Sequence, residues 1–213
     1  MKSRAGHWDQ IFSGTEDDQL GWYEASAAPT LALMATVPGW QSSTVFLPGA
    51  GTSVLIEELL SEGVPLVLND ISRTALEKLK KRLGVRGSAV HWLCQDIAQS
   101  LPSDLPPVDI WVDRAVLHFL IDEADIEGYF TNLRSTLRRG GYALFAEFSK
   151  EGAAKCAGLD LHRYSVEELS SRLGDAFELK AAFDHTYINP GGDPRPYIYA
   201  LYKRTGSDGF SPG

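Results

Sequence analysis

The fold of the chain is decided by the stretch Thr44-Val45-Phe46-Leu47-Pro48-Gly49-Ala50-Gly51-Thr52-Ser53. Its first four residues predict a buried strand, and the glycine-containing turn leads directly into an amphipathic segment over Ser53–Ser61. Glycine lets backbone N–H groups approach a ligand closely, and the N-terminus of a helix favours negative charge. The stretch therefore predicts a strand, a ligand-binding turn and a helix, although a tight turn without a ligand has the same pattern.

The same alternation continues along the chain, because short apolar runs are separated by longer amphipathic segments. This pattern is typical of an α/β fold in which helices cover both faces of a mostly parallel sheet. The four further strands that we expect in this body are Val64–Leu68, Ala89–Leu93, Val108–Val112 and Tyr142–Phe148. The two further helices are Arg73–Leu83 and Glu123–Arg138, the second ended by Gly140-Gly141.

The C-terminal part of the chain has a different pattern. Ser165 with Glu168 three residues later predicts a capped helix, and the segments Phe177–His185 and Pro196–Tyr202 predict an antiparallel hairpin at the sheet edge. We expect three parts: an N-terminal helical cap over residues 1–38, the main domain over residues 39–205, and a disordered tail over residues 206–213.

Composition and charge exclude several classes of function. The 213 residues include 20 Lys and Arg against 28 Asp and Glu, a net charge of −8 that argues against a nucleic-acid partner. The apolar runs are too short to cross a membrane and no secretory signal is visible, so a cytoplasmic protein is expected. Cys94 and Cys156 are read as free thiols, and no metal site is indicated. The oligomeric state cannot be predicted.

Three aspartates stand at or directly after the ends of predicted strands. Asp70 follows the second strand, Asp96 the third and Asp113 the fourth, so all three should meet the glycine turn at one sheet edge. A carboxylate in the place of Asp70 suits both hydroxyls of a ribose, and its alternative role is to cap the next helix. NAD is the second choice of cofactor, because the dinucleotide motif needs a third glycine where this chain has Val54.

With these residues the chain resembles a class I S-adenosylmethionine-dependent methyltransferase, over about Val45 to Phe148. The resemblance implies a Rossmann-like sheet of seven strands with an antiparallel last strand, and S-adenosylmethionine as the cofactor. The residues that it implies for binding the cofactor are Gly49, Ala50 and Gly51 at the methionine part, Asp70 and Ile71 at the ribose, Asp96 and Ile97 at the adenine, and Asp113 near the methionine part.

One position departs from the pattern of the family. The family has an acidic residue two positions before the first glycine, where this chain has Leu47. Asp113 or a backbone carbonyl is then expected to bind the methionine amino group instead.

The N-terminal segment resembles two subsets of this family, but the resemblance does not name the acceptor. Trp8-Asp9-x-x-Phe12 and Gly21-Trp22-Tyr23 loosely resemble the opening of the thiol and thiopurine methyltransferases and of some protein-lysine methyltransferases. A small-molecule acceptor, with a thiol among the candidates, is our first expectation. A protein lysine is the second, and a non-catalytic protein that binds an adenosyl ligand is the third.

Methyl transfer from a sulfonium is an in-line displacement, which needs alignment more than chemical groups. A hydroxyl or ammonium acceptor needs a base, and His118 beside Asp113 is our candidate for it, although a core histidine is an equally good interpretation. Arg114 is expected either to pair with Asp113 or to bind an anionic acceptor.

Overall fold

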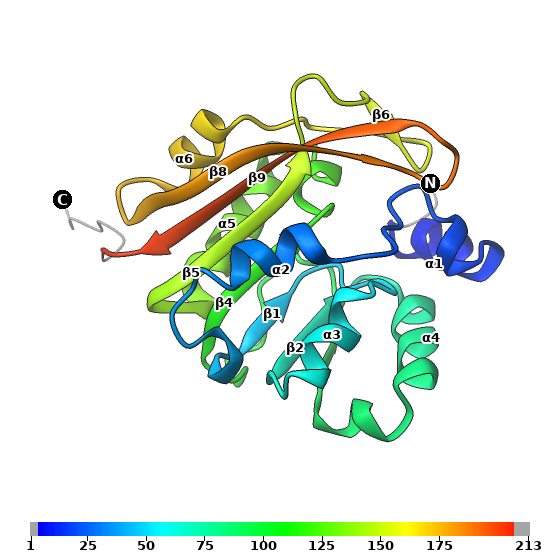
Figure 1. Ribbon diagram of the computed structural model, residues 1–213, viewed down its shortest axis with the longest axis horizontal. Coiled ribbons are helices and arrows are strands. Elements are labelled where there is room, and N and C mark those ends of the chain that lie inside the picture. The colour runs from blue at the N-terminus through cyan, green and yellow to red at the C-terminus, as the bar shows by residue number, and fades with distance from the viewer. Residues whose placement is uncertain (1–3, 207–213) are drawn as a thin grey trace.

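Residues 4–206 are described by the computed structural model, which forms one twisted sheet with helices on both faces (Figure 1). The sheet has seven strands in the order β3-β2-β1-β4-β5-β9-β8. β9 is antiparallel to β5 and β8, and the other pairs are parallel. The strands are β1 (Val45–Leu47), β2 (Leu66–Asp70), β3 (His91–Cys94), β4 (Val108–Arg114), β5 (Leu137–Phe148), β8 (Phe177–Ile188) and β9 (Pro194–Arg204). The predicted fold class is confirmed.

β2 and β4 end later than the sequence predicts. β2 runs to Asp70 and β4 to Arg114, so the acidic residues expected after these strands belong to the strands themselves. Both strands are almost entirely buried, as expected for central parallel strands that are covered on both faces.

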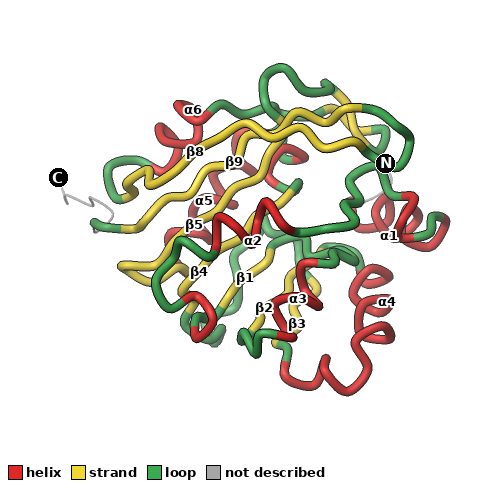
Figure 2. Tube along the Cα trace, viewed as in Figure 1, coloured by secondary structure: helices red, strands yellow, loops and turns green. Residues whose placement is uncertain are grey.

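Helices flank the sheet on both faces (Figure 2). They are α2 (Ala28–Met34), α3 (Leu55–Ser61), α4 (Arg73–Leu83), α5 (Glu123–Thr136) and α6 (Val166–Leu173). α2, α3 and α4 contribute to the core on one face, together with Leu47 and Leu68, and α5 and α6 contribute to the core on the other face, together with Phe46 and Trp111. The cavity described below lies at the carboxyl ends of the parallel strands.

Local sequence explains where α4 begins and ends. The Ser72 hydroxyl accepts a hydrogen bond from Ala75 N–H at 3.1 Å, which satisfies a free backbone donor of the first turn. Leu76, Leu79 and Leu83 form its buried stripe, and Gly84 follows the helix with a φ of +54°. The helix has the bounds that the sequence predicts.

The C-terminal prediction is also confirmed. Ser165 caps α6 by accepting a hydrogen bond from Glu168 N–H at 3.2 Å, and β8 and β9 form the long antiparallel hairpin. A small hairpin of β6 (Lys155–Cys156) and β7 (Leu159–Asp160) lies between β5 and α6. The expected tail over residues 206–213 falls outside the described residues, apart from Gly206.

The N-terminal segment contains α1 (Arg4–Gly14), the short 3₁₀ helix η1 (Asp17–Gln19) and α2. α1 packs alongside α4 at the end of the sheet, as Figure 1 shows. Its Asp9 accepts hydrogen bonds from the Ser72 hydroxyl at 2.6 Å and from Thr74 N–H at 3.0 Å. α2 contributes Leu33 and Met34 to the main core, so only α1 and η1 lie over the sheet edge as a cap.

Candidate active site

A cavity of about 300 Å³ lies at the carboxyl ends of the parallel strands, between the sheet and α1. Open α/β sheets bind ligands at this edge, because the strand-to-helix turns there present backbone N–H groups and polar side chains. The residues predicted for cofactor binding that line the cavity are Gly49, Ala50, Gly51, Asp70, Ile71, Asp96 and Ile97. Seven of the eight predicted cofactor-binding residues are thus brought together.

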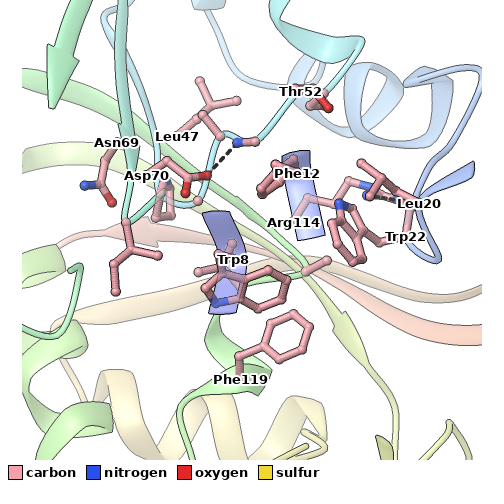
Figure 3. A pocket seen from close by; sticks show the side chains of 18 of the residues that line it. Trp8, Phe12, Leu20, Trp22, Leu47, Thr52, Asn69, Asp70, Arg114 and Phe119 are labelled. Carbon is pink, nitrogen blue, oxygen red and sulfur yellow. Dashed lines mark hydrogen bonds between the residues drawn. The ribbon is translucent and has the colours of Figure 1, made fainter. Parts of the chain in front are cut away.

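The turn after β1 has a shape that requires glycine. Gly49 and Gly51 have φ values of +51° and +53°, a region that L side chains adopt only with strain. A Cβ on Gly49 would lie 2.3 Å from Val116 Cγ2, so the turn also packs directly against the segment that follows β4. The Gly51 N–H donates to Asp70 Oδ2 at 2.8 Å, which fixes the turn against the end of β2 (Figure 3).

Asp70 is buried with one face toward the cavity. Its Oδ1 accepts from Ser72 N–H at 2.7 Å, so Asp70 orders the turn into α4 while Ser72 caps that helix. Burial raises the pKa of the Asp70 carboxyl to about 6, against the effect of these two N–H donors. Each carboxylate oxygen has two acceptor sites, which leaves Asp70 able to accept further hydrogen bonds from a ligand.

The adenine end of the predicted site is at the end of β3. Asp96 Oδ1 accepts from Ala98 N–H at 3.0 Å, and this bond holds the turn in which Ile97 is buried. Both residues line the cavity. The carboxylate and the apolar side chain therefore lie side by side, as recognition of an amino-substituted aromatic ring requires.

Asp113 does not lie in this cavity. It is fully buried on the face of the sheet covered by α5, where its Oδ2 accepts from the Tyr129 hydroxyl at 2.6 Å and its Oδ1 from Val116 N–H at 3.1 Å. Burial, and then the nearby Glu147, raises the pKa of Asp113 well above its ordinary value. The prediction that Asp113 contacts the cofactor or the acceptor does not fit this position.

His118 is also buried behind the cavity, in the 3₁₀ helix η4 (Leu117–Phe119). Its Nδ1 lies 2.6 Å from Glu147 Oε2, and its ring packs against Phe148 and Tyr197. Burial raises the pKa of Glu147 to about 8 and lowers that of His118 to about 3, so the two share one proton as a neutral pair near pH 7. This position favours the interpretation of His118 as a core histidine.

Arg114 does line the cavity, but the predicted pairing with Asp113 is wrong. Its Nε lies 2.6 Å from Glu24 Oε2, and its Nη1 donates to the Trp22 carbonyl at 3.0 Å. Burial alone would lower the pKa of Arg114, but the Glu24 carboxylate raises it above its ordinary value. We did not predict Glu24 as a site residue. It directly follows Trp22-Tyr23, which we singled out for its resemblance to other methyltransferases.

Aromatic side chains cover the cavity from the N-terminal segment. Trp8 and Phe12 come from α1, Trp22 from the segment after η1, and Phe119 from η4 (Figure 3). Trp8 meets Trp22 at 5.5 Å and Phe119 at 4.8 Å between ring centroids, both edge to face. These rings give the cavity an apolar wall, and the faces of such rings attract cations.

Within residues 4–206, no cluster of three or more His, Cys, Asp or Glu side chains has the arrangement of a metal site. None of the helices in that range has both the length and the apolar composition needed to cross a membrane.

Residues 48–143 match the family Methyltransf_12, a methyltransferase domain. The match begins in the glycine turn and ends in β5, so it includes the predicted cofactor residues. With the strand order of the sheet, this match supports the expected Rossmann-like methyltransferase fold. No curated protein sequence is significantly similar to the chain.

Three of the solved structures that resemble the chain show how far the likeness in fold extends. A SAM-dependent methyltransferase from Anabaena variabilis is 15% identical with a TM-score of 0.73, and the match covers 96% of each chain. A protein studied for the conversion of a disulfide bond into a thioacetal group during echinomycin biosynthesis is 14% identical with a TM-score of 0.74, over 95% of this chain and 92% of the other. The 1,6-didemethyltoxoflavin-N1-methyltransferase of Burkholderia thailandensis, bound to S-adenosylhomocysteine, is 19% identical with a TM-score of 0.64, over 86% and 80%. At these identities the likeness supports the fold.

Proposed function

We propose that the chain transfers a methyl group from S-adenosylmethionine to a small-molecule acceptor, and that the acceptor binds beneath the aromatic cover. The observation that carries this proposal is the cavity itself, which continues from Asp96 and Asp70 to Trp22 and Phe119. The first end suits an adenosine, and the second is lined by apolar rings that suit an organic acceptor. Its volume of about 300 Å³ is within the range of small-molecule pockets.

The donor site consists of the residues that the sequence predicted and the cavity brings together. Asp70 accepts the ribose hydroxyls, Asp96 accepts the exocyclic amine of adenine, and Ile71 and Ile97 provide apolar contact. The glycine turn, which lines the cavity, passes beside the methionine part. The carboxylate of Asp70 must be ionised to act in this way at full strength, because a charged acceptor forms the stronger hydrogen bonds.

A thiol is the acceptor class that these positions favour most. His118, the candidate base, and Asp113 beside it are both buried outside the cavity. A thiol reacts as its thiolate, which forms in water near neutral pH to a useful extent and needs no protein base. A hydroxyl acceptor would need a base to remove its proton, and the neutral His118–Glu147 pair does not reach the cavity.

The test uses two acceptors of the same shape. The purified protein is incubated with methyl-labelled S-adenosylmethionine and either thiophenol or phenol, and methylated product is measured by mass spectrometry. We expect methylthiobenzene from the thiol and no product from the phenol. Methylation of phenol at an equal rate would contradict the thiol preference.

A second arm of the test uses a cell extract divided into small molecules, proteins and nucleic acids. Label in the small-molecule fraction is the expected result. Label confined to protein would replace the proposal by the lysine alternative, and binding of S-adenosylmethionine without transfer to any fraction would favour a non-catalytic adenosyl-binding protein.

A further inference from the structure

A buried site that binds the amino-acid end of S-adenosylmethionine must compensate two opposite charges that lie close together. One carbon carries both an ammonium and a carboxylate, and each charge must find an opposite charge or a hydrogen bond when it leaves water. The first strand does not offer an acid here, because Leu47 occupies the position where the resembled family has one. Leu47 is buried and lines the cavity with an apolar side chain.

Asp113 was the expected replacement, and its geometry rules this out. Both of its oxygens are engaged on the opposite face of the sheet, by Tyr129 and by Val116 N–H. Asp70 and Asp96 stand at the ends of β2 and β3, on the adenosine side of the cavity. With Asp113 excluded, the ammonium is left with a backbone carbonyl or with a carboxylate from another part of the chain, and only the carboxylate would compensate its charge.

Other charged residues of the cavity wall are occupied elsewhere. Arg4 pairs with Asp125 at 2.7 Å, on α5, and Asp17 pairs with Lys78 at 2.8 Å and with Arg82 at 3.0 Å, on α4. These contacts hold α1 and η1 over the sheet edge and leave both residues away from the end of β1.

Glu24 and Arg114 offer both charges at one place, beside the ends of β1 and β4. Only one oxygen of Glu24 is used, since Oε2 contacts Arg114 Nε at 2.6 Å and Oε1 is buried without a hydrogen-bond partner. Nη2 of Arg114 is likewise buried without a partner. The side chains are only 9% and 13% exposed, so bulk water does not compensate for these unused groups.

Further contacts of Arg114 hold the Glu24–Arg114 pair in this arrangement, in which only one oxygen of Glu24 contacts the guanidinium. Arg114 Nη1 donates to the Trp22 carbonyl, and the guanidinium lies 5.4 Å from the ring centroid of Tyr187 and 5.9 Å from that of Tyr197. A two-point Arg–carboxylate contact would use both oxygens of Glu24. Here the geometry leaves one acceptor and one donor free in the same buried pair.

We propose that Glu24 and Arg114 bind the amino-acid end of S-adenosylmethionine, with Glu24 Oε1 accepting from the ammonium and Arg114 Nη2 donating to the carboxylate. The proposal rests on the donor site proposed above. It gives Arg114, which the resemblance places near the methionine part, a defined role there, and it adds Glu24. An ion pair of zero net charge meets a zwitterion of zero net charge, so no uncompensated charge is buried. Glu24 thereby replaces the acid that is missing at Leu47.

The test compares two ligands that differ only at the amino-acid end. S-Adenosylhomocysteine and 5′-methylthioadenosine share the adenosine and the thioether, but only the first carries the ammonium and the carboxylate. Binding of both is measured by isothermal titration calorimetry to the wild type and to Glu24→Gln and Arg114→Met. We expect each variant to weaken S-adenosylhomocysteine by about tenfold to a hundredfold, the usual effect of losing a hydrogen bond to a charged group. Affinity for 5′-methylthioadenosine should stay within about twofold.

Decarboxylated S-adenosylmethionine separates the two roles, because it keeps the ammonium and lacks the carboxylate. Glu24→Gln should weaken its binding and Arg114→Met should not. Glu57→Gln is the matched control, since Glu57 also pairs with an arginine, Arg82, and lies outside the cavity wall. It should bind all three ligands as the wild type does.

The outcomes are distinguishable. Equal loss of S-adenosylhomocysteine and 5′-methylthioadenosine in the variants would mean that the pair only supports the fold, and unchanged S-adenosylhomocysteine binding would also overturn the inference. Retained 5′-methylthioadenosine binding shows that a variant is folded around the adenosine site. If the wild type bound neither ligand, the proposed donor site itself would fail.

Discussion

Asp70 and Asp113 each stand at the end of a central parallel strand, yet they face opposite sides of the sheet. Asp70 faces the cavity, together with Arg114, and we call this the cavity-facing side. Asp113 faces α5 and forms a buried cluster with Tyr129, Glu147 and His118, which we call the core-facing side. Side chains alternate between the faces of a strand, so a shift of one residue decides whether a carboxylate meets a ligand or the core.

The two sides differ in their ionisation as well. On the cavity-facing side the charged groups are accompanied by opposite charges or N–H donors, as in Glu24 with Arg114. On the core-facing side burial favours the neutral forms of Glu147 and His118. The same residue types therefore serve ligand binding on one side and loop positioning on the other, because Asp113 and Glu147 accept from the backbone N–H groups of Val116 and His118.

The largest effect is expected at the glycine turn on the cavity-facing side. Gly49→Ala forces an L side chain to a φ of +51° and places Cβ 2.3 Å from Val116 Cγ2. Strain and overpacking together cost about 2–5 kcal/mol, and we expect the binding of S-adenosylhomocysteine, measured by calorimetry, to weaken accordingly.

Gly84→Ala is the matched control for this change. Gly84 has a similar φ of +54° and nothing within 4 Å of the added Cβ, and it lies outside the cavity wall. It should lower the melting temperature without changing ligand affinity. Equal losses of affinity in both variants would mean that general instability, and not the shape of the turn, controls binding.

The next largest effect directly compares the two aspartates. Asp70→Asn should weaken 5′-methylthioadenosine by about tenfold to a hundredfold, because it replaces a charged acceptor of the ribose hydroxyls by a neutral one. Asp113→Asn should leave this affinity within about twofold, since the residue does not line the cavity. Calorimetric titration of both variants measures the two affinities. A larger loss in Asp113→Asn than in Asp70→Asn would contradict the proposed site, because it would place the ligand on the core-facing side of β4.

The sequence predicted the cavity-facing side well where the signals are local. Glycines after one strand and an acid at the end of the next define Gly49, Gly51 and Asp70 without any long-range information. The sequence could not show which residues of β4 face the cavity. Trp111 and Val112 are both apolar and buried, and a strand that is covered on both faces has no alternation of polar and apolar residues. Asp113 and Arg114 were therefore indistinguishable as candidates.

Glu24 could not be predicted from the sequence for a different reason. It lies in an irregular segment and meets Arg114 across 90 positions of the chain, a contact that no periodicity encodes. The sequence offered one indirect indication. Leu47 stands where the resembled family has an acid, so the group that binds the amino group of the donor had to come from another position. The likeness of Trp22-Tyr23 to other methyltransferases drew attention to the rings and not to the residue after them.

A smaller effect follows from the raised pKa of Asp70, about 6, on the cavity-facing side. Ribose hydroxyls bind the ionised carboxyl better, so affinity should be constant above this pKa and fall as pH decreases through it, by at most about tenfold per pH unit. Titrations of 5′-methylthioadenosine between about pH 5 and about pH 8 check this, because this ligand lacks the amino-acid group. Asp70→Asn should remove the dependence, and a dependence that persists in this variant would assign it to another group.

The smallest effect on catalysis is expected on the core-facing side, at His118. Its Nδ1 is engaged by Glu147 and burial lowers its pKa to about 3, so it is neutral and out of reach of an acceptor over the working pH range. His118→Asn should lower the melting temperature, because the ring packs against Phe148 and Tyr197, while kcat for a thiol acceptor keeps the pH profile of the wild type. A general base contributes about a hundredfold or more to the rate. A loss of that size in kcat, with ligand affinity and folding retained, would mean that His118 acts as a general base. The η4 segment would then have to turn toward the cavity during turnover.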